Sequence, residues 1–241
     1  MRILYFIPKS LCCFLFFCTV FSCTIRSKKE GTYGSEKGDA YAAFYQKIDS
    51  GLALLKEGDL VVRSGEEPAS QFIRQLNRQN KDYSHAGIVF FQNGYPFIYH
   101  LVAGDENPDE KLRKDSLLHF ANPRKNSGFA VYRYNVNASE VKNLKQIIEK
   151  WYLQGLSFDD HFNLQSNDKM YCSEMIKKAL ASATHKRISI QTTTPTEEEK
   201  AFYANRTGTP LASLKAMTIV SIDNLYNNVN CRLVKSFRFN P

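Results

Sequence analysis

The sequence lacks several features that would each point to a familiar class of protein. Its longest apolar run, residues 11–21, is only eleven residues long, whereas a membrane-spanning helix needs ~20. No C-x-x-C or H-x-x-x-H spacing is present, so a zinc site is not indicated and no cofactor is expected. Lys and Arg are scattered along the chain, so the net charge of +8 does not indicate nucleic-acid binding.

The N-terminus instead has the pattern of an export signal. Arg2 and Lys9 precede the apolar run, which is typical of a secretory signal peptide. The run ends in Val20-Phe21-Ser22-Cys23, which looks like a bacterial lipobox with Cys23 as the lipidated residue. These residues predict an exported lipoprotein, anchored to a membrane of the bacterial cell envelope by its N-terminal lipid. An ordinary cleaved signal and an uncleaved anchor helix are the alternatives.

The chain after the signal is expected to hold one folded domain. We predict a signal peptide at residues 1–22, a tether at 23–39 and a single domain at 40–241. The tether is expected because residues 24–39 are polar and contain Gly, Ser and Lys, as flexible linkers do. No internal repeat or second linker divides the remainder.

Apolar periodicity and turn residues predict an α+β domain with an antiparallel sheet packed against helices. Asn93-Gly94 is a strong hairpin signal, and Ser139 is the expected N-cap of its helix. Residues 184–209 are expected to form a mobile surface excursion. The predicted helices cover residues 41–55, a stretch after Pro68, 138–153 and 171–183, and the predicted strands cover 60–63, 84–91, 96–102, 129–134 and part of 225–239.

Cysteine usage singles out Cys172 as a candidate nucleophile. Only Cys172 and Cys231 lie outside the signal and the lipobox, so they either form a disulfide or leave Cys172 as a reactive thiol. Cys172 lies at the start of a predicted helix, where unpaired N–H groups and the helix dipole favour a thiolate. The same N–H groups are candidates for an oxyanion hole.

The base for this thiol is expected from the predicted hairpin. His85 opens the first strand, and pairing around Asn93-Gly94 brings it diagonally opposite His100, which could orient the His85 ring. Both histidines could also be purely structural. The other histidines lie in predicted loops or polar stretches and are expected to be solvated: His119, His161 and His185.

Four motifs in this order resemble the circularly permuted papain-like enzymes of the NlpC superfamily, specifically the YiiX-type branch. They are Gly58-Asp59-Leu60-Val61, Tyr83-Ser84-His85-Ala86-Gly87-Ile88, Tyr99-His100 and Tyr171-Cys172-Ser173-Glu174. The resemblance covers roughly residues 57–183, and histidine before cysteine is the permuted order. It implies a permuted papain-like fold, with an antiparallel sheet or small barrel packed against helices.

The resemblance also implies roles for individual residues. Cys172 would be the nucleophile, His85 the base and His100 the polar residue that orients it. Many members of the branch carry glutamate at that third position, whereas the related lecithin:retinol acyltransferase group carries histidine. Because a neutral imidazole stabilises an imidazolium less than a carboxylate does, other carboxylates could take this place: Asp105, Glu106 and Glu174. Tyr83, Tyr171 and Glu174 are candidates for binding substrate or supporting the site.

The leading hypothesis is a thiol-dependent hydrolase that cleaves an amide or ester bond through an acyl-enzyme on Cys172. Peptidoglycan peptides are the first substrate class, and acyl groups of lipids or lipopeptides, with hydrolysis or acyl transfer, are the second. A catalytically silent module that binds lipid or glycan in the envelope is a hypothesis of another class, and a purely structural lipoprotein is a third. The sequence indicates no metal, cofactor, nucleic acid or obligate protein partner.

Overall fold

A computed structural model describes residues 35–104 and 107–239 of the chain. The predicted signal at 1–22, the lipidation residue Cys23, and Asp105 and Glu106 lie outside the described residues. Among the described residues, no helix combines the length and the apolar character needed to cross a membrane. The helices are α1 (Ser35–Leu52), α2 (Pro68–Gln75), α3 (Leu117–Phe120), α4 (Ala138–Leu153), α5 (Cys172–Ala183), α6 (Glu197–Thr207), the 3-10 helix η1 (Leu211–Leu214) and α7 (Ile222–Tyr226).

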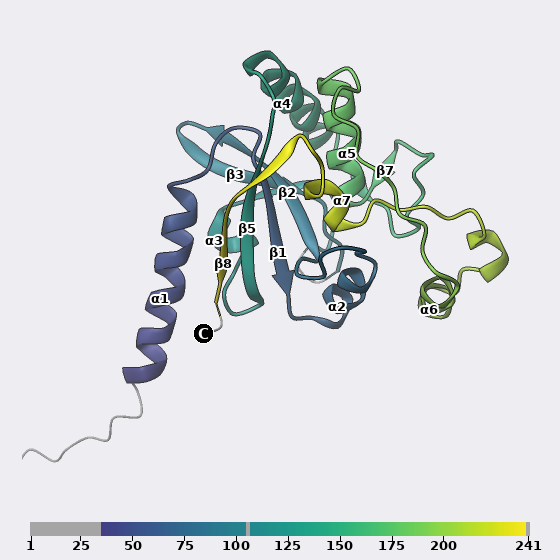
Figure 1. The fold of residues 1–241 in the computed structure, drawn as a ribbon, viewed down its shortest axis with the longest axis horizontal. Coiled ribbons are helices and arrows are strands. Elements are labelled where there is room, and N and C mark those ends of the chain that lie inside the picture. The colour runs from purple at the N-terminus through teal and green to yellow at the C-terminus, as the bar shows by residue number, and fades with distance from the viewer. Residues whose placement is uncertain (1–34, 105–106, 240–241) are drawn as a thin grey trace, which may run out of the picture.

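A six-stranded antiparallel sheet forms the centre of the molecule (Figure 1). Its strand order is β4-β3-β2-β1-β5-β8. A separate pair of two-residue strands lies beside the N-terminus of α5. The sheet strands are β1 (Leu60–Gly65), β2 (His85–Gln92), β3 (Tyr95–His100), β4 (Arg113–Asp115), β5 (Asn126–Tyr134) and β8 (Cys231–Arg238), and the pair is β6 (Ser157–Phe158) with β7 (Lys169–Met170).

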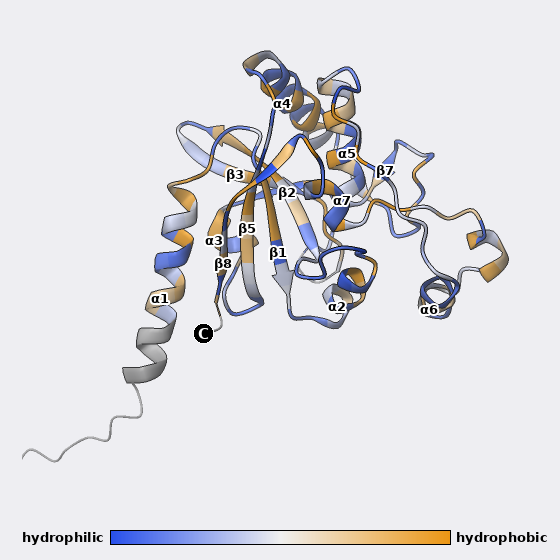
Figure 2. Cartoon of the chain, in the orientation of Figure 1, coloured by the Kyte–Doolittle hydropathy of each residue, from blue (hydrophilic) through white to orange (hydrophobic). Residues whose placement is uncertain are grey.

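Alternating side chains of the sheet build a hydrophobic core on each of its faces. In β1, Leu60 and Val62 contribute to the cluster shared with α4, α5 and α7, whereas Val61 contributes to the cluster shared with α1 and α3. Strands β1 and β5 are coloured largely as hydrophobic along this centre (Figure 2). Because both faces are covered by helices, the strands that carry the candidate site are held rigidly in the middle of the fold.

The β2–β3 hairpin confirms the turn and register expected from the sequence. Asn93 and Gly94 have φ angles of 51° and 82°, the left-handed values that a two-residue hairpin turn requires. Ile88 pairs with Tyr99, so the hairpin has the predicted register. This register brings the first residue of β2 and the last residue of β3 to the same edge of the core.

The motif Gly58-Asp59-Leu60-Val61 leads the chain into β1. Gly58 has a φ of 79°, a conformation that favours glycine. The fully buried carboxylate of Asp59 accepts hydrogen bonds from Arg133 Nε at 2.6 Å and from the Lys56 amide at 2.8 Å. The motif therefore fixes the entry to a central strand, and its contribution is structural.

Helix α5 packs against helix α4 and strand β2. Met175, Ile176 and Leu180 are fully buried in the core between α5, α4 and β2. The apolar spacing in residues 171–183 predicts this helix, and the structure confirms it with a first residue at Cys172. Because the helix axis is fixed by packing, its N-terminus has a defined position relative to the sheet.

Some local predictions are wrong. Asn137, not Ser139, is the N-cap of α4, because the Asn137 side chain accepts from the Glu140 amide at 3.0 Å and Glu140 accepts from the Asn137 amide at 2.9 Å. Helix α1 begins at Ser35, so the last five residues of the predicted tether, 35–39, are helical. They carry no apolar periodicity that could have indicated a helix.

The segment at residues 184–209, predicted as a mobile surface excursion, contains a helix and is partly buried. Helix α6 follows the N-cap Thr196 and ends at Thr207, and the C-cap Gly208 has a φ of 71°. Its Tyr203 is buried, as is Ile188 earlier in the segment. In Figure 1, α6 lies on the side of the sheet that carries α2 and far from α1.

Candidate active site

The Cys172 side chain projects from the N-terminus of α5. Cys172 is the first helical residue, after Tyr171 in an extended conformation. The Tyr171 amide donates to Glu174 Oε2 at 3.3 Å, and the Tyr171 hydroxyl accepts from the Val220 amide at 2.8 Å. These contacts fix the turn that precedes the cysteine. The thiol is thereby held where the first N–H groups of the helix have no partner within the helix.

Burial and local dipoles act on this thiol in opposite directions. Burial raises the pKa of Cys172 above its ordinary value. The N–H groups of Ala86 and Ser173 and the positive charge of Arg63 act against this increase without cancelling it. Cys172 and Cys231 are both free, so the disulfide considered from the sequence is not formed.

His85 lies at the start of β2 with its ring buried beneath Phe120. Its Nε2 atom is 2.8 Å from Nδ1 of His100, as the predicted diagonal placement requires. The Phe120 ring centroid is 5.5 Å from that of His85 and 5.0 Å from that of His100. Burial lowers the pKa of His85 well below its usual value, and the charges of Arg63 and His100 act in the same direction. The uncharged imidazole is therefore favoured in the substrate-free protein.

A carboxylate that the sequence did not indicate lies behind His100. Nε2 of His100 is 3.0 Å from Oδ2 of Asp115, and Arg113 donates to Oδ1 of Asp115 at 2.8 Å. Burial opposes ionisation of Asp115, but the hydrogen bonds from His100 and Arg113 outweigh it and lower its pKa to about 2. Burial also lowers the pKa of His100, against the influence of Asp115.

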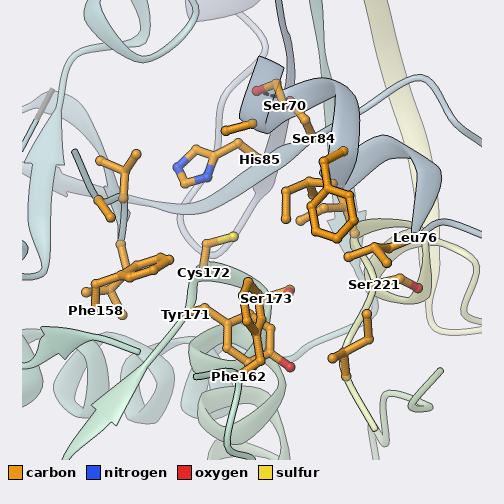
Figure 3. Close-up of a pocket in the computed structure, with 18 of the residues that line it drawn as sticks. Ser70, Leu76, Ser84, His85, Phe158, Phe162, Tyr171, Cys172, Ser173 and Ser221 are labelled. Atoms are coloured by element: carbon orange, nitrogen blue, oxygen red, sulfur yellow. Dashed lines mark hydrogen bonds between the residues drawn. The ribbon is translucent and has the colours of Figure 1, made fainter. Parts of the chain in front are cut away.

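Cys172 and His85 line the same cavity, which has a volume of about 680 Å³. In Figure 3 the His85 ring lies above Cys172, Phe158 lies to the left of Cys172, and Phe162 lies below it beside Tyr171. Apolar side chains make up most of the remaining wall: Phe72, Ile73, Leu76, Leu101, Val102, Tyr171, Tyr203, Ile219, Val220 and Ile222. Charged side chains also line it: Arg63, Glu66, Glu67, Lys125 and Asp160.

Of the three residues expected to bind substrate or support the site, one lines the cavity and two do not. Tyr171 lines the cavity, and its ring is tilted against that of Phe162 with 4.7 Å between the ring centroids. Tyr83 does not line it and packs in the core against aromatic neighbours such as Tyr226. Glu174 is fully buried and pairs with Lys178 at 2.8 Å, so it stabilises α5 and does not orient either histidine.

The third-position alternatives that the sequence left open are therefore placed elsewhere or lie outside the described residues. Among the described residues, Glu174 contacts the Tyr171 amide and Lys178 and has no hydrogen bond to His100, and Asp105 and Glu106 are not described. Asp115 was missed because it comes from β4, a three-residue edge strand in a polar stretch without apolar alternation. No group of three or more potential metal ligands occurs within the part of the chain that the structure describes.

Comparisons with known proteins identify the family and the fold of this chain. Residues 54–224 match the family described as permuted papain-like amidase enzymes, YaeF/YiiX, C92. The fold is similar to a crystal structure described as metalloprotein YiiX from Escherichia coli O157:H7, with a TM-score of 0.61 and 19% identity over 76% of this chain and 98% of that chain. No curated protein matches. The resemblance to YiiX-type enzymes and the α+β permuted papain-like fold are thus confirmed.

Proposed function

Because the chain belongs to the C92 family of permuted papain-like amidases, we propose that it hydrolyses an amide bond through an acyl-enzyme on Cys172. His85 is the base in this proposal, and His100 orients it. One observation carries the assignment: the thiol at the start of α5 shares a cavity with a histidine whose second ring nitrogen is already bonded to His100. A nucleophile, a base and an orienting group are the parts that nucleophilic catalysis requires.

The proposed reaction starts from an uncharged pair. As the Cys172 sulfur attacks the amide carbon, its proton moves to Nδ1 of His85, and the carbonyl electrons move to oxygen. The tetrahedral intermediate collapses when the C–N bond breaks, and His85 returns the proton to the leaving amine. Water then attacks the thioester with its proton taken by His85, and the carboxylic acid leaves as the thiol is restored.

The negative charge of the tetrahedral oxygen has candidate donors at the helix start. The backbone N–H of Cys172 is one, since it has no partner within α5. The N-terminal end of the helix dipole favours the same charge. Losing one such donor typically costs ~100- to 1000-fold in rate, so the placement of Cys172 at this end of the helix supports catalysis directly.

The apolar cavity favours a substrate with an apolar acyl group, such as a fatty acyl amide or a lipopeptide. Each methylene removed from water contributes about 0.8 kcal/mol, which corresponds to about a fourfold lower KM per methylene until the cavity is filled. Acyl transfer to an amine or alcohol uses the same acyl-enzyme and differs only in the group that replaces water.

A cell-wall peptide is the second candidate substrate, and a different observation favours it. Glu66, Glu67 and Asp160 line the cavity beside its apolar wall. Their carboxylates could pair with the free amine of a diamino acid in such a peptide. A series of N-acyl amides of increasing chain length, assayed beside peptidoglycan peptides, distinguishes the two classes by their kcat/KM values.

Export and membrane anchoring are part of the proposal and depend on residues 1–39. The lipobox ending at Cys23 supports lipidation, which would place the enzyme at the surface of an envelope membrane. Mass spectrometry of the N-terminus of the full chain, expressed in bacteria, tests this directly. Diacylated Cys23 is the expected result, and an N-terminus at Met1 or at an unmodified residue would contradict it.

Labelling with iodoacetamide at neutral pH tests the catalytic proposal. We expect wild type to be labelled at Cys172, Cys172→Ala to lose this label, and His85→Ala to be labelled more slowly because the thiol has lost its base. Equal rates for wild type and His85→Ala would show that His85 does not activate the thiol. Ligand binding that survives in Cys172→Ala, without turnover by wild type, would instead support a silent binding module.

A further inference from the structure

A continuous line of hydrogen bonds runs from His85 to a carboxylate. Nε2 of His85 meets Nδ1 of His100 at 2.8 Å, and Nε2 of His100 meets Oδ2 of Asp115 at 3.0 Å. All three side chains lie on adjacent strands of one sheet, and Asp115 pairs in register with Ile98, two residues before His100. The line of hydrogen bonds therefore follows the pairing of three neighbouring strands.

We propose that Asp115 is a positioning residue for the reaction of Cys172, because it fixes which nitrogen of each histidine carries a proton. The inference rests on the proposed function, in which His85 must present an unprotonated nitrogen to the thiol. Asp115 does not contact the reacting atoms and acts through His100.

The protonation pattern follows from the properties of each group. An ionised carboxylate can only accept a hydrogen bond, so the bond between Asp115 and His100 requires the proton on Nε2 of His100. Neutral His100 then has a bare Nδ1, which accepts from Nε2–H of His85. Neutral His85 in turn has a bare Nδ1, the ring nitrogen not engaged by His100. This is the atom that must receive the thiol proton.

The site is built to keep Asp115 ionised. Arg113 donates to Oδ1 at 2.8 Å, and the side chain of Asp115 is only 10% exposed. The hydrogen bonds from His100 and Arg113 hold the pKa of Asp115 near 2, so the carboxylate stays a pure acceptor at neutral pH. Arg113 and His100 face each other in the β3–β4 register, which places the Arg113 head group beside the carboxylate that His100 contacts.

Asp115 also stabilises the charge that develops during the reaction. When His85 takes the thiol proton, its imidazolium donates to His100, which remains hydrogen-bonded to the negative Asp115. In this arrangement the negative charge comes from Asp115, which contacts His100 and does not contact His85 itself. It takes the place of a carboxylate bonded directly to the catalytic histidine. The charged and titratable groups around the two rings are Arg63 of β1, Arg113 and Asp115 of β4, His119 of α3 and Cys172 of α5.

The substitution Asp115→Asn gives the sharpest test. Because Arg113 donates to Oδ1, it selects the amide oxygen at that position and turns the amide NH₂ toward His100. A donor facing Nε2 of His100 reverses the whole line and puts the proton on Nδ1 of His85. That nitrogen can no longer accept the thiol proton, although the geometry is unchanged. A wrong histidine tautomer of this kind costs ~10⁴-fold in the serine-protease example in which the carboxylate contacts the catalytic histidine itself.

The experiment measures the rate of Cys172 alkylation against pH for the full chain and for five variants, three at Asp115, one at Asp109 and one at His85. We expect Asp115→Asn to be slower than wild type by about 100-fold or more at neutral pH, and Asp115→Ala, whose histidines can choose either tautomer, by about tenfold. Asp115→Glu should restore part of the rate. Asp109→Asn, which removes an exposed carboxylate from the loop before β4, is the matched control and should equal wild type.

A purely structural role would give the opposite order, since asparagine preserves the shape of the side chain and alanine does not. ¹⁵N NMR of the histidine rings provides a second readout, in which wild-type His85 should show a bare Nδ1 and Asp115→Asn a protonated one. Superimposable pH profiles for wild type and Asp115→Asn, or a protonated Nδ1 in wild type, would overturn the inference. His85→Ala keeps the proposals separable, because a wild-type rate in that variant contradicts the proposed function itself.

Discussion

Gly87 lies in β2 two residues after His85, and the space around it is too small for any side chain. A Cβ atom built there would be 2.4 Å from Cγ2 of Ile98, 3.0 Å from the carbonyl oxygen of Tyr99 and 3.2 Å from Cβ of His100. Gly87→Ala therefore requires β3 to move away from β2 at the position that carries His100. The perturbation connects the packing of the sheet to the geometry of the site.

The loss of stability in Gly87→Ala can be estimated from the contact between its Cβ atom and Ile98. Ile98 is fully buried, so its side chain cannot move into solvent to relieve the contact. Overpacking of this kind costs ~1–3 kcal/mol. For a domain of this size each kcal/mol lowers Tm by roughly 2–4 °C, so we expect a decrease of about 2–12 °C in Gly87→Ala. A displaced His100 should also lengthen its 2.8 Å contact with His85 and slow alkylation of Cys172.

Thermal unfolding and thiol alkylation, measured on the same samples, check both parts. Gly94→Ala is the control, because Gly94 has a φ of 82° with nothing within 4 Å of its Cβ position. Its backbone strain should cost ~1–2 kcal/mol and leave the thiol rate unchanged. A Gly87→Ala variant with the Tm and alkylation rate of wild type would refute the close packing of β2 on β3 described above.

Three further predictions concern stability. Asp59→Ala should lower the free energy of unfolding by about 3 kcal/mol in a urea titration, because it removes the buried carboxylate that pairs with Arg133. A decrease below about 0.5 kcal/mol, the size of a typical surface substitution, would contradict this. Tyr171→Phe should cost about 1–3 kcal/mol by the same assay, because the buried Val220 amide loses its acceptor; an unchanged midpoint would argue against that bond. Burial lowers the folded-state pKa of His85, so below about pH 6.5 the unfolded chain binds a proton that the folded chain does not, and the free energy of unfolding should decrease as the pH falls. The substitution His85→Gln should make this decrease smaller. The same pH dependence in wild type and His85→Gln would exclude His85 as its source.

Features encoded by short-range signals could be predicted from the sequence. Asn93-Gly94 identified the hairpin and its register, and that register placed His85 beside His100. The apolar spacing after Tyr171 identified α5 with Cys172 at its start. In each case the relevant residues are close in sequence or linked through one tight turn, so local geometry determines their positions.

Features that depend on distant contacts could not be predicted. Asp115 reaches His100 only because a three-residue edge strand pairs with β3, and its residues carry no alternating pattern. The ends of α6 did carry signals, with Thr196 and Glu199 as a capping box and Gly208 in the left-handed conformation. Its interior has no apolar stripe, however, so composition alone suggested a loop. Phe202 of α6 contacts Phe72 of α2, with 4.6 Å between the ring centroids, although the two residues are far apart in the sequence.

Burial of the site determines the charge states of Cys172 and His85 before a substrate binds. Burial lowers the pKa of His85 and raises that of Cys172, so both shifts oppose an ion pair in the empty protein. In the proposed mechanism, the ion pair would therefore form only as the substrate reacts, when the developing charges meet side chains and backbone groups that are already in place. In that mechanism the N–H groups at the start of α5 would stabilise the negative charge, and Asp115 would stabilise the positive charge through His100. Because these groups would not have to move, the protein would avoid the reorganisation that water requires, so a largely apolar cavity could still accelerate a reaction that creates charge.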